Sequence, residues 1–260
     1  MTNLLISYPD IPARAVSISA SPNFLTLYPV DNLFSGHRRN WGETTGHQDA
    51  DIEIIFDMGE GNTASVDHCI LSHADRLITD GATAFSVSSS DDGVSYSTQF
   101  TEATLNAATL YSGDYVAEIT EYSARWHKLI IEANNDIAFS KIHLGKWLNL
   151  GNDPDEFPYN PQLEDGVIKY TSGSDSIYRL NKEMLNIEIS WDFLSDTAIE
   201  NWLNLIARNN DIRYLFLYTT SQHRILNDRV LLNCELSGWE HEKILDNNNN
   251  LSASFLEILG

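Results

Sequence analysis

The sequence predicts a mainly β protein of two domains, the second of which carries one α-helix. Short runs in which apolar and polar residues alternate recur through the first half, as in Val16–Ala20 and Ile52–Gly59. A segment with three prolines and three acids follows at residues 151–161, and a convincing helical stripe appears only after it. The expected fold class is a β-sandwich followed by a second β-sandwich or barrel with one flanking α-helix.

Composition limits the classes of partner. The 260-residue chain carries 16 Lys and Arg against 37 Asp and Glu, a formal charge of -21. We therefore expect it to repel nucleic acid rather than bind it stably. The start lacks a basic leader, and no stretch approaches the about 20 apolar residues that span a bilayer. These features predict synthesis and folding in a cytoplasm, without membrane insertion.

The first domain is expected over residues 1–150, as strands without a helix. Residues 4–30 contain four prolines and should be extended, and residues 31–51 should form a held loop. In Phe85–Gly93, the alternation predicts the edge of a hairpin, with Phe85 and Val87 buried and the serines solvated. Cys69 and Cys234 lie in apolar runs and indicate buried side chains rather than a disulfide. The other strands are expected at Ile52–Gly59, Val66–Leu71, Tyr111–Ile119, Ala124–Glu132 and Ile137–Trp147.

Several short blocks occur in a fixed order in this half: Asp31-Asn32-Leu33, Trp41, Ile52–Gly59, Val87–Gly93, Arg125–Ile131 and Ile142–Gly145. The order of these blocks is similar to that of the discoidin, or coagulation factor 5/8 type C, family. The family's pair of terminal cysteines is absent, and Ile52 stands where an aromatic residue is usual. The resemblance implies a galactose-binding-like β-sandwich of jelly-roll type over roughly residues 10–148.

The second half begins with a predicted Pro-rich acidic linker at 151–162 and continues as a β domain over 163–260. Ser195 can cap a helix at about 196–208, in which Ile199, Trp202, Leu203 and Ile206 form an apolar stripe. Such a stripe normally covers its own sheet, so the hairpin at 163–191 is the better candidate for subunit contacts. Strands are expected at Val167–Tyr170, Ile177–Leu180, Leu185–Trp191, Tyr214–Thr219, Val230–Glu240 and Leu251–Ile258, the last two separated by the polar run 246–250.

This layout resembles the tube-type fold of tailed-bacteriophage proteins, among them tail tube, distal tail and minor tail proteins. The resemblance implies a structural virion component that assembles with itself as a ring or tube around the DNA path, beside other tail proteins, with the first domain outside. It implies a location in the phage tail after synthesis in the host cytoplasm. An acidic lining would keep passing DNA from sticking.

Catalytic signatures are missing from the sequence: it has no zinc-protease motif, nucleophile elbow, phosphate loop or dinucleotide-binding glycine pattern. We therefore expect neither an enzyme nor a cofactor. His68 and His73, five apart on an expected strand, would point to opposite faces and make poor partners for one metal. Asp31, Asp49 and Asp51 would suit a Ca²⁺ loop, but coincidence among so many acids is the favoured reading, and no metal is predicted.

One basic cluster stands out in the acidic chain. It comprises His37, Arg38, Arg39 and Trp41, with Asn40 between them. In galactose-binding-like domains, loops at one end of the sandwich can grip sugars by stacking and hydrogen bonding. The alternative function is therefore a carbohydrate-binding adhesin that recognises a cell-surface glycan. The structural interpretation, which the sequence favours, has Trp41 closing the core and the arginines neutralising nearby acids or meeting a neighbouring subunit.

Overall fold

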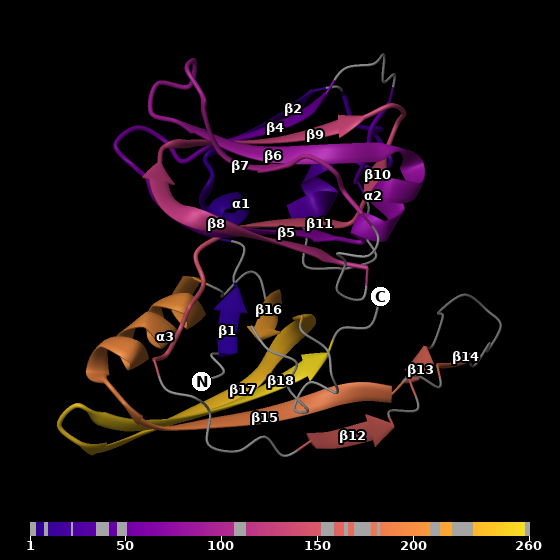
Figure 1. The fold of residues 1–260 in the computed structure, drawn as a ribbon. Coiled ribbons are helices and arrows are strands. Elements are labelled where there is room, and N and C mark those ends of the chain that lie inside the picture. The colour runs from indigo at the N-terminus through magenta and orange to yellow at the C-terminus, as the bar shows by residue number, and fades with distance from the viewer. Residues whose placement is uncertain are drawn as a thin grey trace. The chain divides into compact units, whose positions relative to one another are not determined.

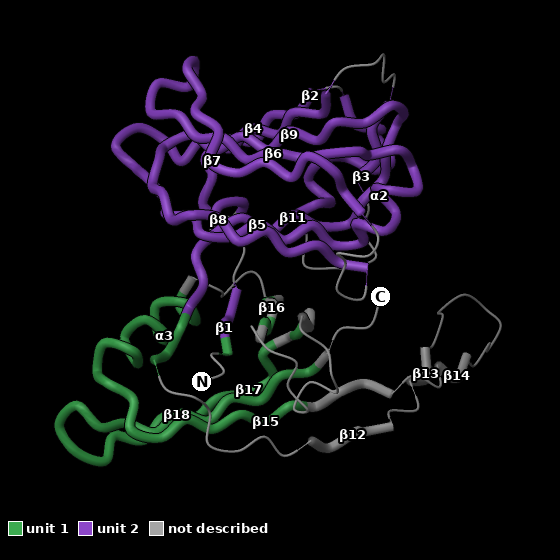
Figure 2. The backbone as a smooth tube through the Cα atoms, in the orientation of Figure 1, with its two compact units in different colours: residues 1–4, 149–228, 232–260 green, residues 5–148, 229–231 purple. Residues whose placement is uncertain are grey.

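The computed structural model divides into two compact units (Figure 2). Unit 1 comprises residues 1–4, 149–228 and 232–260, and unit 2 comprises residues 5–148 and 229–231. The expected domain boundaries stay a prediction. No helix among the described residues is long and apolar enough to cross a membrane. The structure describes residues 4–7, 10–21, 23–34, 42–45, 51–106, 113–151, 159–163, 166–168, 178–180, 183–208, 214–219 and 231–257.

Unit 2 is built from two main antiparallel sheets (Figure 1). The larger has the order β2 (Ser17–Ser21), β4 (Ile52–Asp57), β9 (Trp126–Ala133), β6 (Ala82–Ser90) and β7 (Ser97–Glu102). The smaller has the order β11 (Lys141–Gly145), β5 (Ala64–Ser72) and β8 (Tyr115–Ala124). A short pair, β3 (Gly42–Glu43) and β10 (Ala138–Phe139), and the helices α1 (Asp10–Arg14), η1 (Val30–Phe34, a 3-10 helix) and α2 (Ala74–Asp80) complete the unit.

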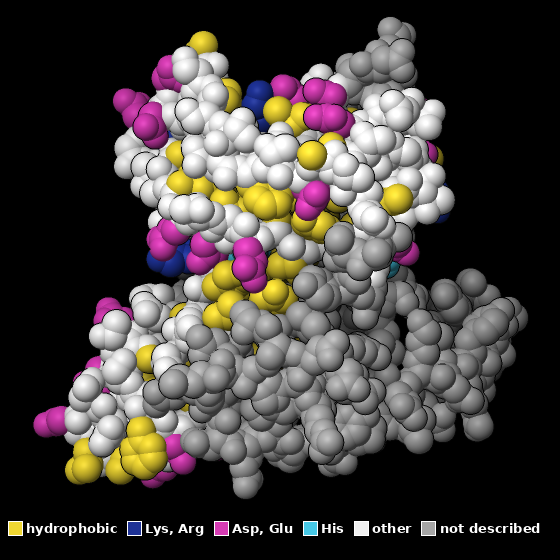
Figure 3. Space-filling model, in the orientation of Figure 1, with side chains coloured by type: hydrophobic (Ala, Val, Ile, Leu, Met, Phe, Trp, Pro, Cys, Tyr) yellow, Lys and Arg dark blue, Asp and Glu magenta, His cyan; other side chains and the backbone are white. Residues whose placement is uncertain are grey.

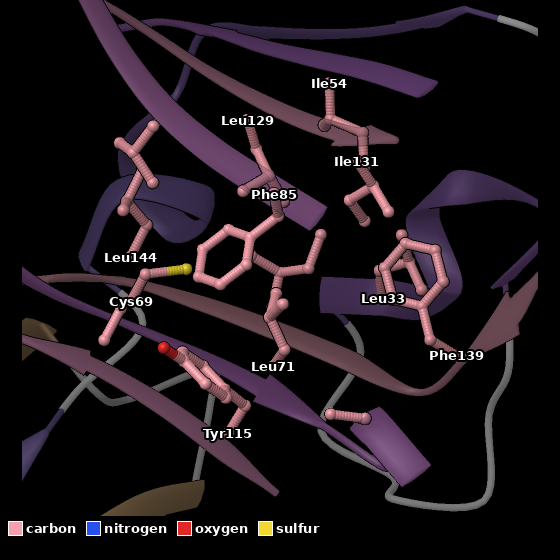
Figure 4. Packing of buried hydrophobic residues seen from close by; sticks show 14 of the residues in the cluster. Leu33, Ile54, Cys69, Leu71, Phe85, Tyr115, Leu129, Ile131, Phe139 and Leu144 are labelled. Carbon is pink, nitrogen blue, oxygen red and sulfur yellow. The ribbon is translucent and has the colours of Figure 1, made fainter. Parts of the chain in front are cut away.

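The core of unit 2 lies between these sheets (Figure 4). Phe85 of β6 is buried, and its ring meets Tyr115 edge-on at 5.3 Å and Phe100 at 5.4 Å between centroids. Cys69 of β5 lies in the same cluster, with its sulfur directed toward the Phe85 ring (Figure 4). Both Cys69 and Cys234 are free and buried, as predicted. The mainly β fold class, with one flanking helix in the second half, is confirmed.

The hairpin expected at Phe85–Gly93 is confirmed, because β6 and β7 pair across the turn that follows Ser90, but its expected place at an edge is wrong, because β6 is an inner strand. It pairs with β7 on one side and with β9 on the other. Phe85 and Val87 are buried as predicted, but so are Ser88 and Ser90 on the opposite face. The pairing with β9 joins residues about forty positions apart, as in Ser88 with Lys128. Local alternation does not reveal a partner so far along the chain.

The expectation of a first half without helices is also wrong. Helix α2 begins after His73, whose φ of 55° turns the chain out of β5, and ends at Gly81 with a φ of 108°. Ala74 and Leu77 supply a buried face of only one turn, which is too short to give a periodic signal. His73 thus lies beyond the strand on which it was expected to oppose His68.

The second half contributes most of a six-stranded sheet. Its order is β1 (Leu4–Ser7), β16 (Tyr214–Thr219), β17 (Leu231–Leu245), β18 (Asn248–Glu257), β15 (Glu183–Leu194) and β12 (Tyr159–Leu163). A separate pair joins β13 (Gly166–Ile168) to β14 (Tyr178–Leu180). Strand β12 overlaps the expected linker. It can contain Pro161 because it is an edge strand, in which the backbone position that lacks an N–H can face away from the neighbouring strand.

Helix α3 (Asp196–Arg208) confirms the one predicted helix. Its first turn is capped by Ser195, whose Oγ accepts a hydrogen bond from the Ala198 amide at 3.1 Å. Trp202 is fully buried against Trp191 and Phe255 of the sheet, with ring centroids 6.4 and 6.5 Å away. The expected stripe is wrong at Leu203, which is 40% exposed.

The turn between β17 and β18 is only Asp246–Asn247, so the expected separation of the two strands by the whole polar run 246–250 is wrong, because β18 begins at Asn248. The run also holds the start of α3. Asn247, with a φ of 60°, accepts a hydrogen bond from the Asp196 amide through its side-chain oxygen at 3.1 Å. Asn249 is buried and donates to the Leu194 carbonyl at 3.1 Å and to the Asp196 carboxylate at 2.8 Å. His241 lies 2.9 Å from the Asn249 side-chain oxygen. The tip of the hairpin is therefore fixed to the helix.

Candidate functional site

The segment that contains the predicted sugar-binding residues lies outside the described part of the chain. This holds for His37, Arg38, Arg39 and Trp41, so their role stays a prediction. Both flanks are described, because η1 ends at Phe34 and β3 begins at Gly42. These flanks decide where the segment leaves the sandwich and where it returns.

The two flanks meet in the core of unit 2. Leu33 of η1 is buried, and a Cβ atom added to Gly42 would lie 2.7 Å from its Cδ2 atom. Carbon atoms do not approach so closely, so only glycine permits this contact. Phe34 packs edge-on against Phe56 of β4, with ring centroids 5.5 Å apart. Segment 35–41 therefore starts and ends at one firmly packed point.

Thr44 ties the end of β3 to the turn before β10. Its amide donates to the Ile137 carbonyl at 3.0 Å, and its Oγ1 accepts from the Ile137 amide at 2.9 Å. The same hydroxyl donates to the Asp136 carboxylate at 3.3 Å. Thr44 is buried, so these bonds replace contacts with water and rigidify the return point of the segment.

An exposed aromatic residue lies on the turn beside β3. The Leu25 amide donates to the Glu43 carbonyl at 2.8 Å, and the Glu43 amide donates to the Tyr28 carbonyl at 3.0 Å. This clamp leaves Tyr28 43% exposed and Leu27 83% exposed. Sequence reasoning missed Tyr28, although an aromatic residue directly before Pro29 in a turn-rich stretch is a usable signal.

The carboxylates considered for Ca²⁺ are not gathered by the described residues. Asp31 lies in the first turn of η1 and Asp51 directly before β4, both exposed, and Asp49 lies outside the described part. Within that part, no three His, Cys, Asp or Glu side chains are placed to hold a metal ion. We therefore do not propose a metal site.

At the far end of β4, the residues that carry the discoidin-like pattern make structural contacts. Arg125 donates to both carboxylate oxygens of Asp57, at 2.8 and 3.1 Å, and this bond lowers the pKa of Asp57. The Gly59 amide donates to the same carboxylate at 2.9 Å. The Arg125 guanidinium lies 5.1 Å from the Trp126 ring centroid, and a Cβ on Gly93 would lie 2.8 Å from that ring. Trp126 is thus engaged by the protein itself.

A Ser–His–Asp chain of hydrogen bonds is present but closed to substrate. The Ser7 Oγ lies 2.5 Å from His68 Nε2, and His68 Nδ1 lies 2.9 Å from the Asp67 carboxylate. Ser7 and His68 have no exposed surface, and the Trp147 ring is stacked on the imidazole at 3.7 Å. Burial lowers the pKa of His68 while Asp67 opposes the shift. A nucleophile that no substrate can reach does no chemistry, so the chain is a structural bond network.

A second buried polar group lies in the core. Tyr122 and His127 are hydrogen bonded, with 3.2 Å between the phenolic oxygen and Nδ1. Burial lowers the pKa of His127 to about 4 and raises that of the Cys69 thiol to about 12. At neutral pH the imidazole is uncharged and the thiol is protonated, which suits neither a general acid nor a nucleophile.

Comparison with known proteins finds likenesses of structure only. No family model matches the chain, and no curated protein matches it. It is similar to a GH29 fucosidase from Ruminococcus gnavus in complex with fucose, at 15% identity and a TM-score of 0.42, over 54% of this chain and 27% of that one. It is similar to chitosan-binding module 1 of a chitosanase/glucanase from Paenibacillus sp. IK-5, at 12% identity and a TM-score of 0.39, over 51% of this chain and 96% of that one.

A third likeness is to the CBM32 module of AlyQ in complex with 4,5-unsaturated mannuronic acid, at 16% identity and a TM-score of 0.37, over 50% of this chain and 94% of that one. The neighbours thus include carbohydrate-binding modules and fucosidases, and none of those named is a phage protein. The chain covers less than a third of the length of two fucosidases, 29% of a putative alpha-L-fucosidase from Bacteroides thetaiotaomicron and 27% of the Ruminococcus gnavus enzyme. Likenesses this distant establish no enzyme family and carry no argument about function.

Proposed function

We propose that this chain is a carbohydrate-binding protein and that the sugar binds where segment 35–41 leaves unit 2. The observation that carries the proposal is the anchored frame around that segment. Leu33 and Gly42 hold both ends at one point, and the clamped turn beside β3 exposes Tyr28. Such a frame adds an aromatic ring to a stretch already rich in donors.

The chemistry of the segment fits a sugar. Specific small-ligand sites combine aromatic surface with a few placed polar groups. Tyr28 and Trp41 offer ring faces, while Arg38 and Arg39 offer planar sets of N–H donors that suit vicinal hydroxyls or a sugar carboxylate. The rest of the chain is strongly acidic, so this stretch is where an anionic glycan would meet least repulsion.

The test is a glycan array followed by calorimetry with the full chain. The array should contain neutral and uronic-acid glycans, so that the class of ligand is read directly. Trp41→Ala, Arg38→Ala and Tyr28→Ala should each weaken binding by about tenfold or more, equal to about 1.4 kcal/mol. The control is Val94→Ala, in an exposed turn next to β7, which should leave affinity unchanged. An array without a single retained glycan would overturn the proposal.

A labelling experiment separates binding from catalysis. Because Ser7 is buried, an active-site-directed fluorophosphonate should not label the folded chain. Labelling that disappears in Ser7→Ala would show that the Ser7–His68–Asp67 chain opens to solvent. That result would replace the binding proposal with a hydrolase.

A second candidate function is the structural one, a ring-forming component of a phage tail. The observation that favours it is the outer half of β17 in unit 1. Trp239, Ile244 and Leu245 are exposed there, and hydrophobic side chains gather at the tip of the β17–β18 hairpin (Figure 3). Exposed apolar groups on a long strand are typical of assembly surfaces. Rings in negative-stain images of the pure chain would support this function, and a monodisperse monomer at high concentration would reject it.

A further inference from the structure

Strand β2 is an edge of the larger sheet of unit 2. It pairs with β4 over its whole length without a register shift, from Ser17 opposite Asp57 to Ser21 opposite Glu53. No described strand lies on its other side (Figure 1). In an antiparallel pair, alternate N–H and C=O groups of an edge strand point away from the neighbour and are open to another strand. Within the described part of the chain, the outward backbone donors and acceptors of β2 therefore have no strand to pair with.

Two other edge strands, β7 and β12, carry devices that discourage pairing. Strand β7 has a register shift between Val87 and Ser88 of its partner, which breaks a regular ladder. Strand β12 contains Pro161, which lacks a donor. Strand β2 has neither an irregularity nor a proline, and its sequence Ser-Ile-Ser-Ala-Ser has no charge.

The outer half of β17 is protected by its charges. When two copies of one strand pair about a two-fold axis, each residue points to the same face of the sheet in both copies. Because directly opposed residues also share a face and side chains alternate along a strand, opposed residues differ by an even number of positions. With the axis at His241, Glu240 would oppose Glu242, and with the axis at Glu242 or Lys243 that residue would oppose its own copy. Like charges placed opposite each other disfavour each of these registers.

Strand β2 is self-complementary about Ser19. A two-fold axis at this residue places Ser19 opposite its copy, Ile18 opposite Ala20, and Ser17 opposite Ser21. The serines are exposed on the outer face, whereas Ile18 and Ala20 face the core and are only partly buried. Pairing would give the outward backbone groups hydrogen-bond partners and add to the burial of both apolar side chains.

Exposed apolar side chains flank the same strand in the sequence. The large hydrophobic residues exposed in the described part of unit 2 are Val16, Leu27, Tyr28 and Val94, at 67%, 83%, 43% and 83%. All but Val94 lie within residues 16–28, just before β2 or shortly after it. Val16, directly before β2, can add apolar contact area at the end of the open strand.

We infer that the chain forms a symmetric dimer in which β2 pairs antiparallel with β2 of a second copy, centred on Ser19. The two five-stranded sheets then join into one. Stable protein interfaces bury at least about 1,200 Å² of surface, and a ladder of only five residues on each side should bury less. The dimer should therefore be weak, and its population should depend on concentration. The inference does not require that unit 2 bind sugar, but a dimer would present any such site twice and raise avidity.

The test uses charge at the symmetry axis. Ser19→Lys and Ser19→Glu each place like charges opposite each other in the homodimer and should weaken it at least about tenfold. An equimolar mixture of the two variants places Lys opposite Glu and should restore the dimer. Ser86→Lys is the matched control, because Ser86 lies on the same face in the inner strand β6 and should leave the dimer intact. Sedimentation velocity, from low micromolar to the highest soluble concentration, measures each species.

Hydrogen exchange of the unmodified chain gives a readout without variants. The outward amides of β2 should become protected as concentration rises, while those of β7 stay unchanged. A chain that remains monomeric at all concentrations overturns the inference. Dimers of Ser19→Lys as tight as those of the unmodified chain would also overturn it, and so would a mixture that fails to restore association. Loss of a glycan signal in these variants would concern avidity alone, so the sugar-binding proposal is judged separately by its own variants.

Discussion

The two units place their critical polar groups differently. In unit 2, His68, His127 and His143 lie inside the protein, and burial lowers the pKa of each. In unit 1, the described polar network lies at a corner, where Asn249 joins the hairpin tip to the first turn of α3. Unit 2 should therefore respond to acid through its neutral core imidazoles, whereas unit 1 should depend on apolar packing and on one hydrogen-bonded corner.

The largest expected effect tests the apolar packing of unit 1. Trp202→Ala removes a fully buried ring between Trp191 and Phe255 and should cost about 3–5 kcal/mol. Calorimetry should show the transition of unit 1 shifted down or lost while that of unit 2 persists. Leu203→Ala, which removes a half-exposed side chain from the next position, should cost less than about 1 kcal/mol. Equal losses in both variants would show that the helix does not cover a core.

The second largest effect should be the loss of stability of unit 2 at low pH. The unfolded His127 imidazole binds a proton near pH 6.5, but burial keeps the folded one neutral until about pH 4. The unfolded state therefore binds more protons in this window, and stability falls with falling pH, by up to about 3 kcal/mol for this group. Urea titrations across the window measure the slope. His127→Gln should flatten it, and an unchanged slope in this variant would place the acid sensitivity elsewhere.

The third effect in size should be the loss of stability when the ion pair at the end of β4 is removed. Arg125→Ala removes both guanidinium donors from the largely buried Asp57 carboxylate, leaving it the Gly59 amide, and should cost about 2 kcal/mol after allowance for the partial exposure of Arg125. Lys146→Ala breaks the exposed pair with Glu121 and should cost less than about 0.5 kcal/mol. Chemical denaturation gives the free energy of unfolding of both variants and shows whether the Arg125–Asp57 pair stabilises unit 2 more than an exposed ion pair does.

The smallest effect concerns the corner of unit 1. Asn249→Ala leaves the Leu194 carbonyl and the Asp196 carboxylate without their buried donor and should cost about 1–2 kcal/mol. Ser237→Ala removes an exposed bond to the Ser254 carbonyl and serves as the control, with little change expected. A loss no larger than that of the control would show that the Asn249 hydrogen bonds do not stabilise unit 1.

What the sequence predicted follows from the range of the interactions involved. Helix α3 was predicted because its cap, Ser195, and its stripe are local. The buried cysteines were predicted because each lies in an apolar run. The inner position of β6 and the short helix α2 were missed, since the first depends on pairing with distant β9 and the second on the single backbone reversal at His73.

The candidate site was predictable only in part. The basic and aromatic side chains of residues 37–41 are visible in the sequence. The frame is not, because Leu33 meets Gly42 only after η1 and β3 fold onto the core. Tyr28 likewise gains its place through hydrogen bonds of the turn with Glu43, a residue fifteen positions away that no local pattern connects to it.

The contact between Asn247 and the Asp196 amide has a consequence for the order of folding. The two residues are separated by 51 positions, so the helix can begin under its own Ser195 cap, but the Asp196 amide gains its Asn247 acceptor only when the last hairpin closes. Contacts of such long range form late, because loop-closure entropy must be overcome first. We expect α3 to form early and fray at its start, and amide exchange at Asp196 to slow only when β17 and β18 have paired.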